Sequence, residues 1–396
     1  MRRKQRLTIC LEGLYYLVVL SFIIGGAMLR GINLLYLLAG MMIGPLLYNW
    51  RVVTLTLNRV QVRRRLPQSV CAGDLLVVEF EAVCTSRRGA ASALIVADRI
   101  AFESSDSAGA GRAEVDRADV FFPLVEAGRP QVQSYQGRLM QRGRYRFGPF
   151  FVSTRFPLGL VRRTATIDQV DELIVGPRPG RLKPRWRQVS QATLVGSGSR
   201  ARQGLVEGDF YGLRDWRSGD SRRWVHWRTT ARRNKLTVRQ FEQPHSQDIA
   251  ILLDLWQPAT LGDAAQDNVE LAVSFAASVV EEVCRRGQTR LGLGTAGASI
   301  SWKFATASRA ILSESMERLA LVQAGSEDRT AALLLDALPQ IPPGTMTCLI
   351  STRPVDLADT QRFAALWDDP RMRTAMTQIL CIDASSDELF EYFEPV

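Results

Sequence analysis

The sequence predicts a multi-domain protein in which an N-terminal transmembrane helical hairpin precedes a β-sandwich-like domain and a C-terminal α/β domain. Three patterns support this fold class. Two apolar runs lie within the first 50 of the 396 residues, a segment with period-two alternation follows, and strand-like and helix-like stretches alternate after residue 247. At roughly 100 to 200 residues per domain, the chain has room for two or three domains.

Residues 1–50 predict two transmembrane helices. Leu11 to Leu29 is apolar except for Glu12, and a second apolar run extends from Ile32 to Tyr48. Each run is about long enough to cross a bilayer core of roughly 30 Å at 1.5 Å per residue. A cleaved signal peptide is the alternative for the first run, but no small-residue cleavage site leads to a polar mature start.

Basic residues predict the orientation of this hairpin. The turn between the two runs carries Arg30 alone, whereas both outer flanks are rich in cations. The flanking cations are Arg2, Arg3, Lys4 and Arg6 before the first run and Arg51, Arg59, Arg63, Arg64 and Arg65 after the second. By the positive-inside rule both ends lie in the cytoplasm, and the flanks are placed to contact anionic membrane lipids.

Residues 51–182 predict a β-rich, immunoglobulin-like domain. Apolar and polar side chains alternate from Val52 to Leu57 and from Leu75 to Val83, which is the period-two signal of strands. Glycine, proline and serine clusters separate the other candidate strands, which are Ala93–Val96, Val120–Leu124, Val132–Leu139, Arg144–Arg155 and Glu172–Val175. About seven short strands of this kind are typical of a β-sandwich.

Residues 247–396 predict an α/β domain. Asp248–Leu255 has the pattern of a buried strand and Val269–Arg286 that of an amphipathic helix. The other expected elements are strands at Thr289–Thr295, Ile300–Phe304, Met346–Ser351 and Gln378–Asp383 and helices at Ala307–Val322, 330–338 and Leu357–Asp368. This alternation implies a parallel sheet with helices on both faces. Ligands of such sheets collect at the carboxyl ends of strands, where Asp254, Ser351 and Asp383 fall.

The distribution of charge argues against a protein that binds nucleic acid over its whole length. The net charge is +10, yet residues 248–396 contain 11 basic and 21 acidic side chains, and this acidic part repels phosphate. The six cysteines form no C-x-x-C pair, and His226 and His245 are the only histidines. This composition excludes the usual zinc sites and fits a reducing compartment.

Residues 183–246 form a segment of unusual composition. Within it, residues 205–242 interleave arginines with three tryptophans and three aspartates, which are Trp216, Trp224, Trp227, Asp209, Asp215 and Asp220. Guanidinium groups that stack on indoles and pair with carboxylates would fold such a segment tightly. Basic residues between aromatic rings also bind single-stranded nucleic acid, but these aspartates would neutralise such a groove. His226 has no nucleophile or metal partner at a suitable spacing, so we expect a packed, hydrogen-bonded histidine.

Three segments of the chain together resemble the bacterial family called domain of unknown function 58. They are the N-terminal hairpin, residues 142–163 (RGRYRFGPFFVSTRFPLGLVRR) and residues 207–233 (EGDFYGLRDWRSGDSRRWVHWRTTARR). The positions that match the family motif are Gly208, Asp209, Arg214, Gly219, Asp220, Arg222, His226, Trp227, Ala231 and Arg232. Together with Asp215, Trp216 and Arg228, they form the candidate interaction motif.

The resemblance implies an architecture and a cellular context. Members of this family combine a membrane hairpin and a β domain with a von Willebrand factor A-like, Rossmann-like α/β domain, and they are encoded beside a MoxR-type AAA+ ATPase. In the von Willebrand factor A domains that bind Mg²⁺, the first strand ends in D-x-S-x-S, whose oxygens hold the ion. Here Asp254 is retained but Trp256 and Pro258 replace the two hydroxyl residues, so we expect a degenerate site without metal.

These observations predict an adaptor of the bacterial inner membrane, with its soluble domains in the cytoplasm, a MoxR-type AAA+ ATPase as its partner, and neither catalytic activity nor a cofactor. Two alternatives remain open. The chain could be an enzyme that uses Asp254, Asp215 or Asp220 as an acid or base, in which case raised carboxylate pKa values would gather in one cleft. Residues 183–240 could instead bind anionic lipid or nucleic acid, with a steep salt dependence.

Overall fold

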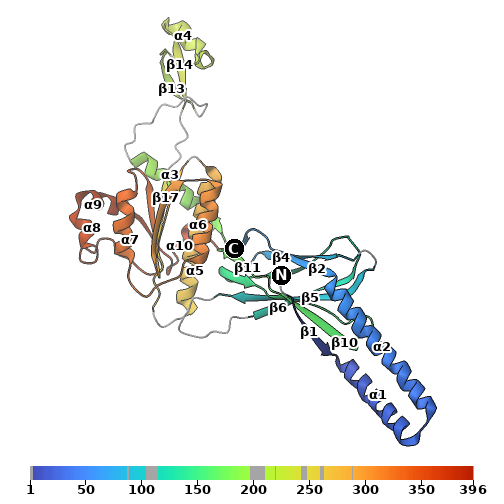
Figure 1. Cartoon of the computed structure of the whole chain (residues 1–396). Helices are drawn as coiled ribbons and strands as arrows, with labels where there is room; N and C mark the ends of the chain where they lie inside the picture. Colours follow the sequence, from blue (N-terminus) through green and yellow to red (C-terminus); the bar gives the residue numbers. More distant parts are fainter. Residues whose placement is uncertain are drawn as a thin grey trace. The chain divides into compact units, whose positions relative to one another are not determined.

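The computed structural model of the chain divides into two compact units, Met1–Arg178 and Pro179–Val396 (Figure 1). It describes residues 3–86, 89–103, 115–196, 210–218, 220–241, 248–258, 263–287 and 289–395.

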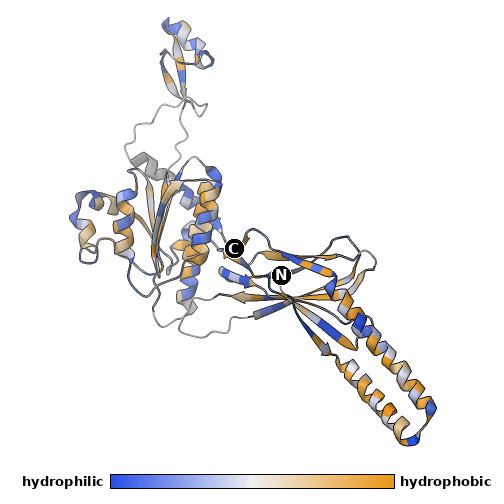
Figure 2. Cartoon of the chain, in the orientation of Figure 1, coloured by the Kyte–Doolittle hydropathy of each residue, from blue (hydrophilic) through white to orange (hydrophobic). Residues whose placement is uncertain are grey.

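Two apolar helices lie side by side near the start of the first unit: α1 (Leu11–Arg30) and α2 (Asn33–Asn58) (Figure 1). Helix α1 ends at Gly31, whose φ of 61° allows its N–H to donate to the carbonyl of Ala27. The Tyr16 hydroxyl donates to the carbonyl of Met42 at 2.8 Å and links the two helices. Among the described residues, α1 is the one helix long and apolar enough to cross a membrane, with a mean hydropathy of 1.7. Both helices carry mainly apolar side chains (Figure 2).

The strand predicted at Val52–Leu57 is wrong, because these residues form the last turns of α2. Val53 and Leu57 are four residues apart and therefore lie on one helix face, and both are buried. Leu57 belongs to the core of the β domain. The boundary expected after residue 50 consequently falls inside a helix.

The N-terminal residues form a strand that the sequence analysis did not predict. Strand β1 (Arg3–Ile9) pairs antiparallel with β10 (Val161–Ile167), so several of the expected flanking cations lie in a sheet. The N–H of Cys10 donates to the carbonyl of Leu160 at 3.0 Å. At Gly13 a Cβ atom would stand 2.0 Å from the same carbonyl oxygen, so only glycine permits this close approach.

The β domain contains two sheets that share one hydrophobic core. The smaller sheet has the order β2-β4-β7, from Val60–Arg65, Leu75–Cys84 and Gln131–Arg138. The larger has the order β1-β10-β9-β5-β8-β11-β3, with β6 paired to β5; its further strands are β3 (Val70–Cys71), β5 (Ala91–Phe102), β6 (Val115–Val125), β8 (Gly143–Phe147), β9 (Phe150–Thr154) and β11 (Asp171–Gly176). Phe80 of β4 meets Phe150 of β9 edge to face, with ring centroids 5.3 Å apart, so the inner faces of the two sheets are in contact. The single strand predicted at Arg144–Arg155 is in fact two, β8 and β9.

The second unit is built on a five-stranded sheet with the order β17-β16-β15-β18-β19. The strands are β15 (Ile249–Asp254), β16 (Arg290–Ala296), β17 (Ile300–Thr306), β18 (Met346–Ser351) and β19 (Leu380–Asp383). All pairs are parallel except the edge pair of β16 and β17. The predicted alternation of strands and helices is therefore confirmed.

Helices cover both faces of this sheet, and the side chains of β15 show why. Ile251 and Leu253 enter one core together with residues of α5 (Asp263–Arg286) and α6 (Arg309–Leu321). Leu252 points the other way, into a core shared with α7 (Thr330–Ala337), α8 (Ala364–Asp368) and α9 (Pro370–Met376). A strand buried on both faces must be apolar at every position, which accounts for its unbroken apolar run. The helix expected at Leu357–Asp368 begins only at Ala364.

The residues that follow Arg178 belong to this α/β unit rather than to the segment predicted to start at residue 183. Strand β12 (Arg181–Leu182) pairs with β20 (Phe393–Glu394), which follows α10 (Leu389–Tyr392). Helix α3 (Pro184–Gly196) places Trp186 edge to face against Phe275 of α5, at 5.2 Å between ring centroids. The chain therefore crosses to the second unit near residue 179, slightly earlier than the sequence analysis expected.

Candidate functional site

Most of the candidate interaction motif folds into a small element of its own, residues 210–241, which we call the arginine–tryptophan module. Strands β13 (Phe210–Asp215) and β14 (Thr237–Phe241) pair antiparallel, and a 3₁₀ turn, η1 (Arg222–Trp224), and helix α4 (Trp227–Arg233) lie between them. Val225 and Val238 are buried in the module and form an isolated bridge. Three residues of the motif, Gly208, Asp209 and Gly219, lie outside the described residues.

Arg214 and Asp220 fix the loop between β13 and η1. The two guanidinium Nη atoms each donate to one carboxylate oxygen at 2.7 Å, which is a bidentate pair. The backbone N–H of Arg217 also donates to Asp220 at 2.8 Å. The hydrogen bonds from Arg214 lower the pKa of Asp220, and the same pair raises the pKa of Arg214. Asp220 is therefore a structural anion rather than a general acid poised near neutral pH.

His226 stands at the N-terminus of α4 and caps it. Its Nδ1 atom accepts a hydrogen bond from the backbone N–H of Thr229 at 3.3 Å and lies 2.8 Å from the Thr229 hydroxyl. The backbone N–H of His226 donates to the carbonyl of Thr237 on β14. The expected hydrogen-bonded histidine is confirmed: its half-buried ring caps α4, and its backbone connects this cap to β14.

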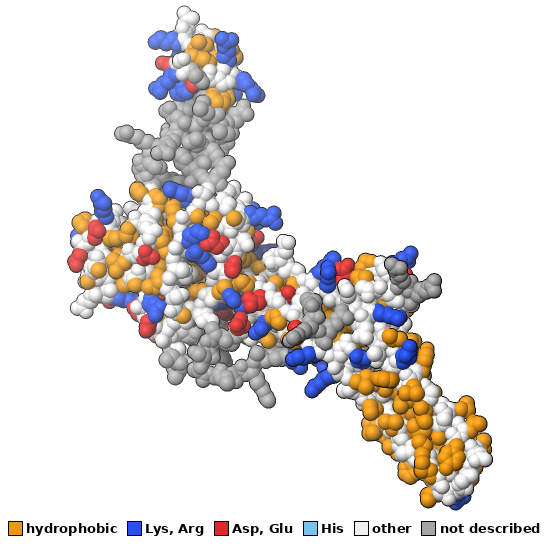
Figure 3. Space-filling model, in the orientation of Figure 1, with side chains coloured by type: hydrophobic (Ala, Val, Ile, Leu, Met, Phe, Trp, Pro, Cys, Tyr) orange, Lys and Arg blue, Asp and Glu red, His pale blue; other side chains and the backbone are white. Residues whose placement is uncertain are grey.

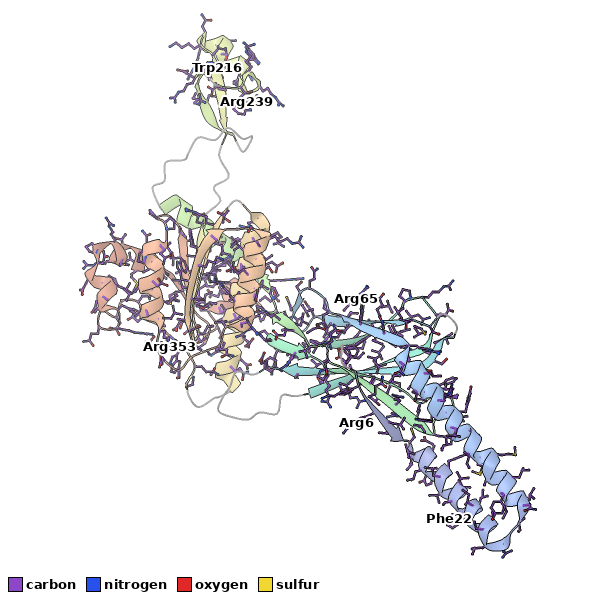
Figure 4. All side chains as sticks on the ribbon, viewed as in Figure 1. Arg6, Phe22, Arg65, Trp216, Arg239 and Arg353 are labelled. Atoms are coloured by element: carbon purple, nitrogen blue, oxygen red, sulfur yellow. The ribbon has the colours of Figure 1, made fainter. Side chains whose placement is uncertain are left out.

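The outer surface of the module is basic and carries one large exposed aromatic ring. Between Phe210 and Phe241 the chain has nine arginines and lysines but only two aspartates. The exposed residues with side chains on this surface include Asp215, Arg217, Arg222, Arg223, Arg228, Ala231, Arg232 and Arg239. Trp227 is 67% exposed, whereas Trp216 is half-buried. The backbone N–H of Trp216 donates to the carbonyl of Leu236. Figure 3 shows the arginines and lysines around the module, and Figure 4 shows Trp216 and Arg239 on it.

A second group of polar side chains lies at the carboxyl ends of β15 and β18 in the α/β unit. We call it the strand-end cluster: Asp254, Trp256, Asp328, Thr330, Ser351, Arg353 and Arg362. The carboxylate of Asp254 is buried and accepts hydrogen bonds from the Ser351 hydroxyl at 2.9 Å and from Nε of Arg353 at 3.4 Å. The predicted position of Asp254, Ser351 and Asp383 at the carboxyl ends of strands is confirmed. Asp383 is not part of the cluster, since its carboxylate accepts from Ser385 instead.

Arg353 (Figure 4) joins two parts of the strand-end cluster. Its guanidinium lies 4.8 Å above the Trp256 ring, and its Nη2 atom is 2.7 Å from Asp328. Arg362 approaches the other oxygen of Asp328 at 2.8 Å. Partial burial opposes ionisation of Asp328, but hydrogen bonds from Arg362 and Thr330 and the charge of Arg353 lower its pKa to about 2. The sequence analysis missed Asp328, Arg353 and Arg362; the single sequence signal was an arginine two residues after a buried strand.

The strand-end cluster does not fit a divalent cation. The described residues contain no group of three or more His, Cys, Asp or Glu side chains that could hold a metal ion. Trp256 and Pro258 carry no side-chain oxygen, and the indole N–H of Trp256 donates to the carbonyl of Ser326. The Asp254 carboxylate already faces the guanidinium of Arg353. The carboxylates of Asp254 and Asp328 are thus paired with arginines, and a divalent ion would have to displace these guanidinium groups to use their oxygens as ligands.

Comparison with protein families and curated sequences gives two similarities. Residues 212–342 match the family described as "Protein of unknown function DUF58". This region contains the described part of the module from Gly212 onward and the elements from β15 to α7 of the α/β unit, and it ends before β18. The chain is also 28% identical over 159 residues to "Uncharacterized protein YeaD" of Bacillus subtilis (strain 168). That match covers 40% of this chain and 38% of the relative's length.

Similarities to solved structures are weak. A β-glucosidase from Listeria innocua in complex with gluconolactone matches 30% of this chain and 16% of its own, with 15% identity and a TM-score of 0.19. The match to a CARDB domain from Pyrococcus furiosus covers 29% of this chain and 86% of the domain, with 12% identity and a TM-score of 0.19. The match to the alkylpurine DNA glycosylase AlkC of Pseudomonas fluorescens covers 40% of this chain and 42% of the glycosylase, with 17% identity and a TM-score of 0.21. TM-scores this low support no conclusion about fold or function.

Proposed function

We propose that the chain is a membrane-anchored cytoplasmic adaptor of the domain of unknown function 58 family. Its α/β unit, which we take to be of von Willebrand factor A-like type, and its arginine–tryptophan module would bind a partner protein, a MoxR-type AAA+ ATPase. The match over residues 212–342 and the motif resemblance support the family part of this proposal. The identity of the partner rests on the resemblance.

The observation that carries the proposal is the exposed Trp227 side chain within a basic surface. Tryptophan and arginine are the residues most often found at the energetic centre of protein interfaces. Two-thirds of Trp227 is exposed, so a partner that buried the indole would gain most of its apolar area. The Arg214–Asp220 pair and the His226 cap hold the surrounding loops, so this surface is arranged before binding.

The charge of the module indicates what the partner surface must offer. Arg222, Arg223 and Arg228 are exposed and form no ion pair with a carboxylate in the described part of the chain. A complementary surface therefore needs carboxylates around an apolar pocket that accepts the Trp227 ring. Such a surface would associate quickly at low salt and more slowly as ionic strength rises.

Membrane anchoring is supported by the helix α1 and by the apolar surface of α1 and α2. Phe22, Leu29 and Met41 are among the large apolar side chains that these helices expose (Figure 3; Phe22 is labelled in Figure 4). In water this surface would be costly, whereas lipid tails would cover it. We propose that α2 crosses the membrane as well as α1, with both ends of the hairpin and the soluble units in the cytoplasm.

The experiment that tests the adaptor function is cross-linking of the tagged full-length chain in its native membrane, followed by mass spectrometry. The test variant is Arg222→Glu/Arg223→Glu, because both arginines are exposed and neither belongs to the Arg214–Asp220 pair that folds the module. A charge-matched control is Arg129→Glu/Arg138→Glu, which changes two exposed arginines of the β domain, a part of the chain that the proposal does not assign to the interface. We expect a AAA+ ATPase to be cross-linked to the wild type and to the control, but not to the test variant. Absence of any ATPase from all three chains would refute the proposal.

An anionic lipid surface is the second candidate partner, favoured by the same excess of nine cationic over two anionic side chains in the module. If lipid is the partner, the Arg222→Glu/Arg223→Glu variant should lose binding to vesicles that contain phosphatidylglycerol. A protein partner predicts unchanged vesicle binding and loss of the ATPase.

A further inference from the structure

We infer that the guanidinium of Arg353 is the resident cation of the strand-end cluster and that it takes the place of a divalent metal ion there. The inference starts from Asp254, whose side chain is buried at the carboxyl end of β15. A buried carboxylate is costly unless a cation or strong hydrogen bonds compensate it. The Ser351 hydroxyl supplies one hydrogen bond, and Arg353 supplies the positive charge at 3.4 Å.

The position of Arg353 is fixed from several sides. Its Nη2 atom lies 2.7 Å from Asp328, so one guanidinium bridges carboxylates that are 74 positions apart in the sequence. Its plane stacks on Trp256 at 4.8 Å, which is a cation–π contact. Trp256 occupies the position where the metal-binding motif has its first hydroxyl ligand, so the residue that would hold a metal instead holds an arginine.

The charge balance of the cluster leaves no room for a further cation. Two carboxylates, Asp254 and Asp328, face two guanidinium groups, Arg353 and Arg362. A divalent ion among them would bring an excess of two positive charges into a site whose Asp254 is buried, and it would repel both arginines. The cluster is therefore complete without metal. The arginine also gives what a metal would give: a fixed link between the loop after β15 and the loop before α7.

This inference makes a prediction about energetic coupling. If Arg353 neutralises Asp254, removing Arg353 leaves the buried carboxylate without its cation, whereas removing the Asp254 charge leaves Arg353 paired with Asp328. In the double variant no buried charge lacks a partner, so the cost of Arg353→Met is relieved. The variants are Arg353→Met, Asp254→Asn and the double variant, each made in the full-length chain in detergent. The thermal unfolding midpoint of each chain is measured in EDTA and in Mn²⁺, an ion that substitutes for Mg²⁺. Arg309→Met is the control for the loss of an exposed arginine.

We expect the unfolding midpoint of the wild type to be the same in EDTA and in Mn²⁺. Each single variant should have a lower midpoint than the wild type. The decrease for the double variant should be smaller than the sum of the two single decreases. Arg309→Met should match the wild type. Additive losses would show that Arg353 and Asp254 are not coupled and would overturn the inference. A rise of the wild-type midpoint in Mn²⁺ that Asp254→Asn abolishes would also overturn it.

A second measurement keeps the inference testable if Arg353→Met does not fold. Electron paramagnetic resonance counts free Mn²⁺ during titration of the wild type and of Asp254→Asn, which needs no change at Arg353. Equal free Mn²⁺ with both chains supports a resident arginine. Binding of one Mn²⁺ per chain by the wild type alone would place a metal at Asp254 and contradict it.

Discussion

Arg214 and Asp220 face each other across the loop of the arginine–tryptophan module, with both Nη atoms of the arginine 2.7 Å from the two carboxylate oxygens. This pair spans six residues and, with the Arg217 N–H bond to Asp220, sets the path of the chain between β13 and η1. The fold of the module thus depends on two residues of the motif, whereas its exposed arginines and Trp227 are available for binding.

The first prediction is that Arg214→Lys opens this loop. Lysine keeps the charge but cannot form two parallel hydrogen bonds with one carboxylate, so the bidentate geometry is lost. We expect faster trypsin cleavage within residues 214–233 of the full-length chain in detergent. Asp215→Asn is the control, because Asp215 is exposed and its carboxylate forms no ion pair with the residues that the structure describes. Equal cleavage rates for the two variants would contradict a structural role for the pair.

The features that the sequence predicted correctly depend on neighbouring residues, whereas those it did not predict depend on contacts between residues far apart in the sequence. The strands and helices of the α/β unit were readable because each depends on local periodicity, and Asp254 and Ser351 were placed together because parallel strands end at one edge. Arg353, Asp328 and Arg362 were missed, because their pairing depends on how separate loops are brought together. The error at Val52–Leu57 has a similar origin: the alternation of side chains was real, but the packing of Val53 and Leu57 on one face favoured a helix.

The second prediction concerns acid. Because Arg362, Thr330 and Arg353 lower the pKa of Asp328 to about 2, against about 3.9 for an aspartate in an unfolded chain, ionised Asp328 favours the folded state. This contribution is fully present above about pH 4 and is lost as the pH falls toward 2. We expect the denaturant midpoint of the wild type to fall over that interval, and Asp328→Asn to remove part of the fall. The measurement is tryptophan fluorescence during urea titration at several pH values. An identical pH dependence of the two chains would show that Asp328 contributes nothing.

The third prediction uses two glycines of helix α1. A Cβ at Gly13 would clash with the Leu160 carbonyl, where the first turn of the helix meets the β domain, whereas a Cβ at Gly25 would meet nothing within 4 Å. We expect Gly13→Ala to lower the thermal unfolding midpoint of the detergent-solubilised chain. Gly25→Ala should leave it unchanged or raise it slightly, since alanine favours the helix by up to about 1 kcal/mol. Equal midpoints for the two variants would exclude a tight contact between Gly13 and Leu160.

The fourth prediction compares two neighbouring arginines of strand β2. The Arg64 side chain is 0% exposed and lies 2.6 Å from Asp98 and 2.7 Å from Asp171, whereas Arg65 (Figure 4) is 60% exposed and pairs with Glu81 alone. Burial raises the pKa of Asp98 although the charge of Arg64 opposes this, and burial with the nearby Asp98 raises the pKa of Tyr135, whose hydroxyl donates to Asp98.

Arg64→Met should therefore leave Asp98 buried without its cation and destabilise the β domain by roughly 3–5 kcal/mol. Arg65→Met removes only an exposed ion pair and should cost less than about 1 kcal/mol. Equilibrium urea unfolding of the two variants, made in the same full-length background and followed by circular dichroism, measures both values. The strand position, the residue type and the replacement are matched, so a difference in stability reports the burial of the charge. If Arg64→Met were as stable as Arg65→Met, Asp98 would have to be neutral in the folded protein, and the buried pair would not hold the two sheets together.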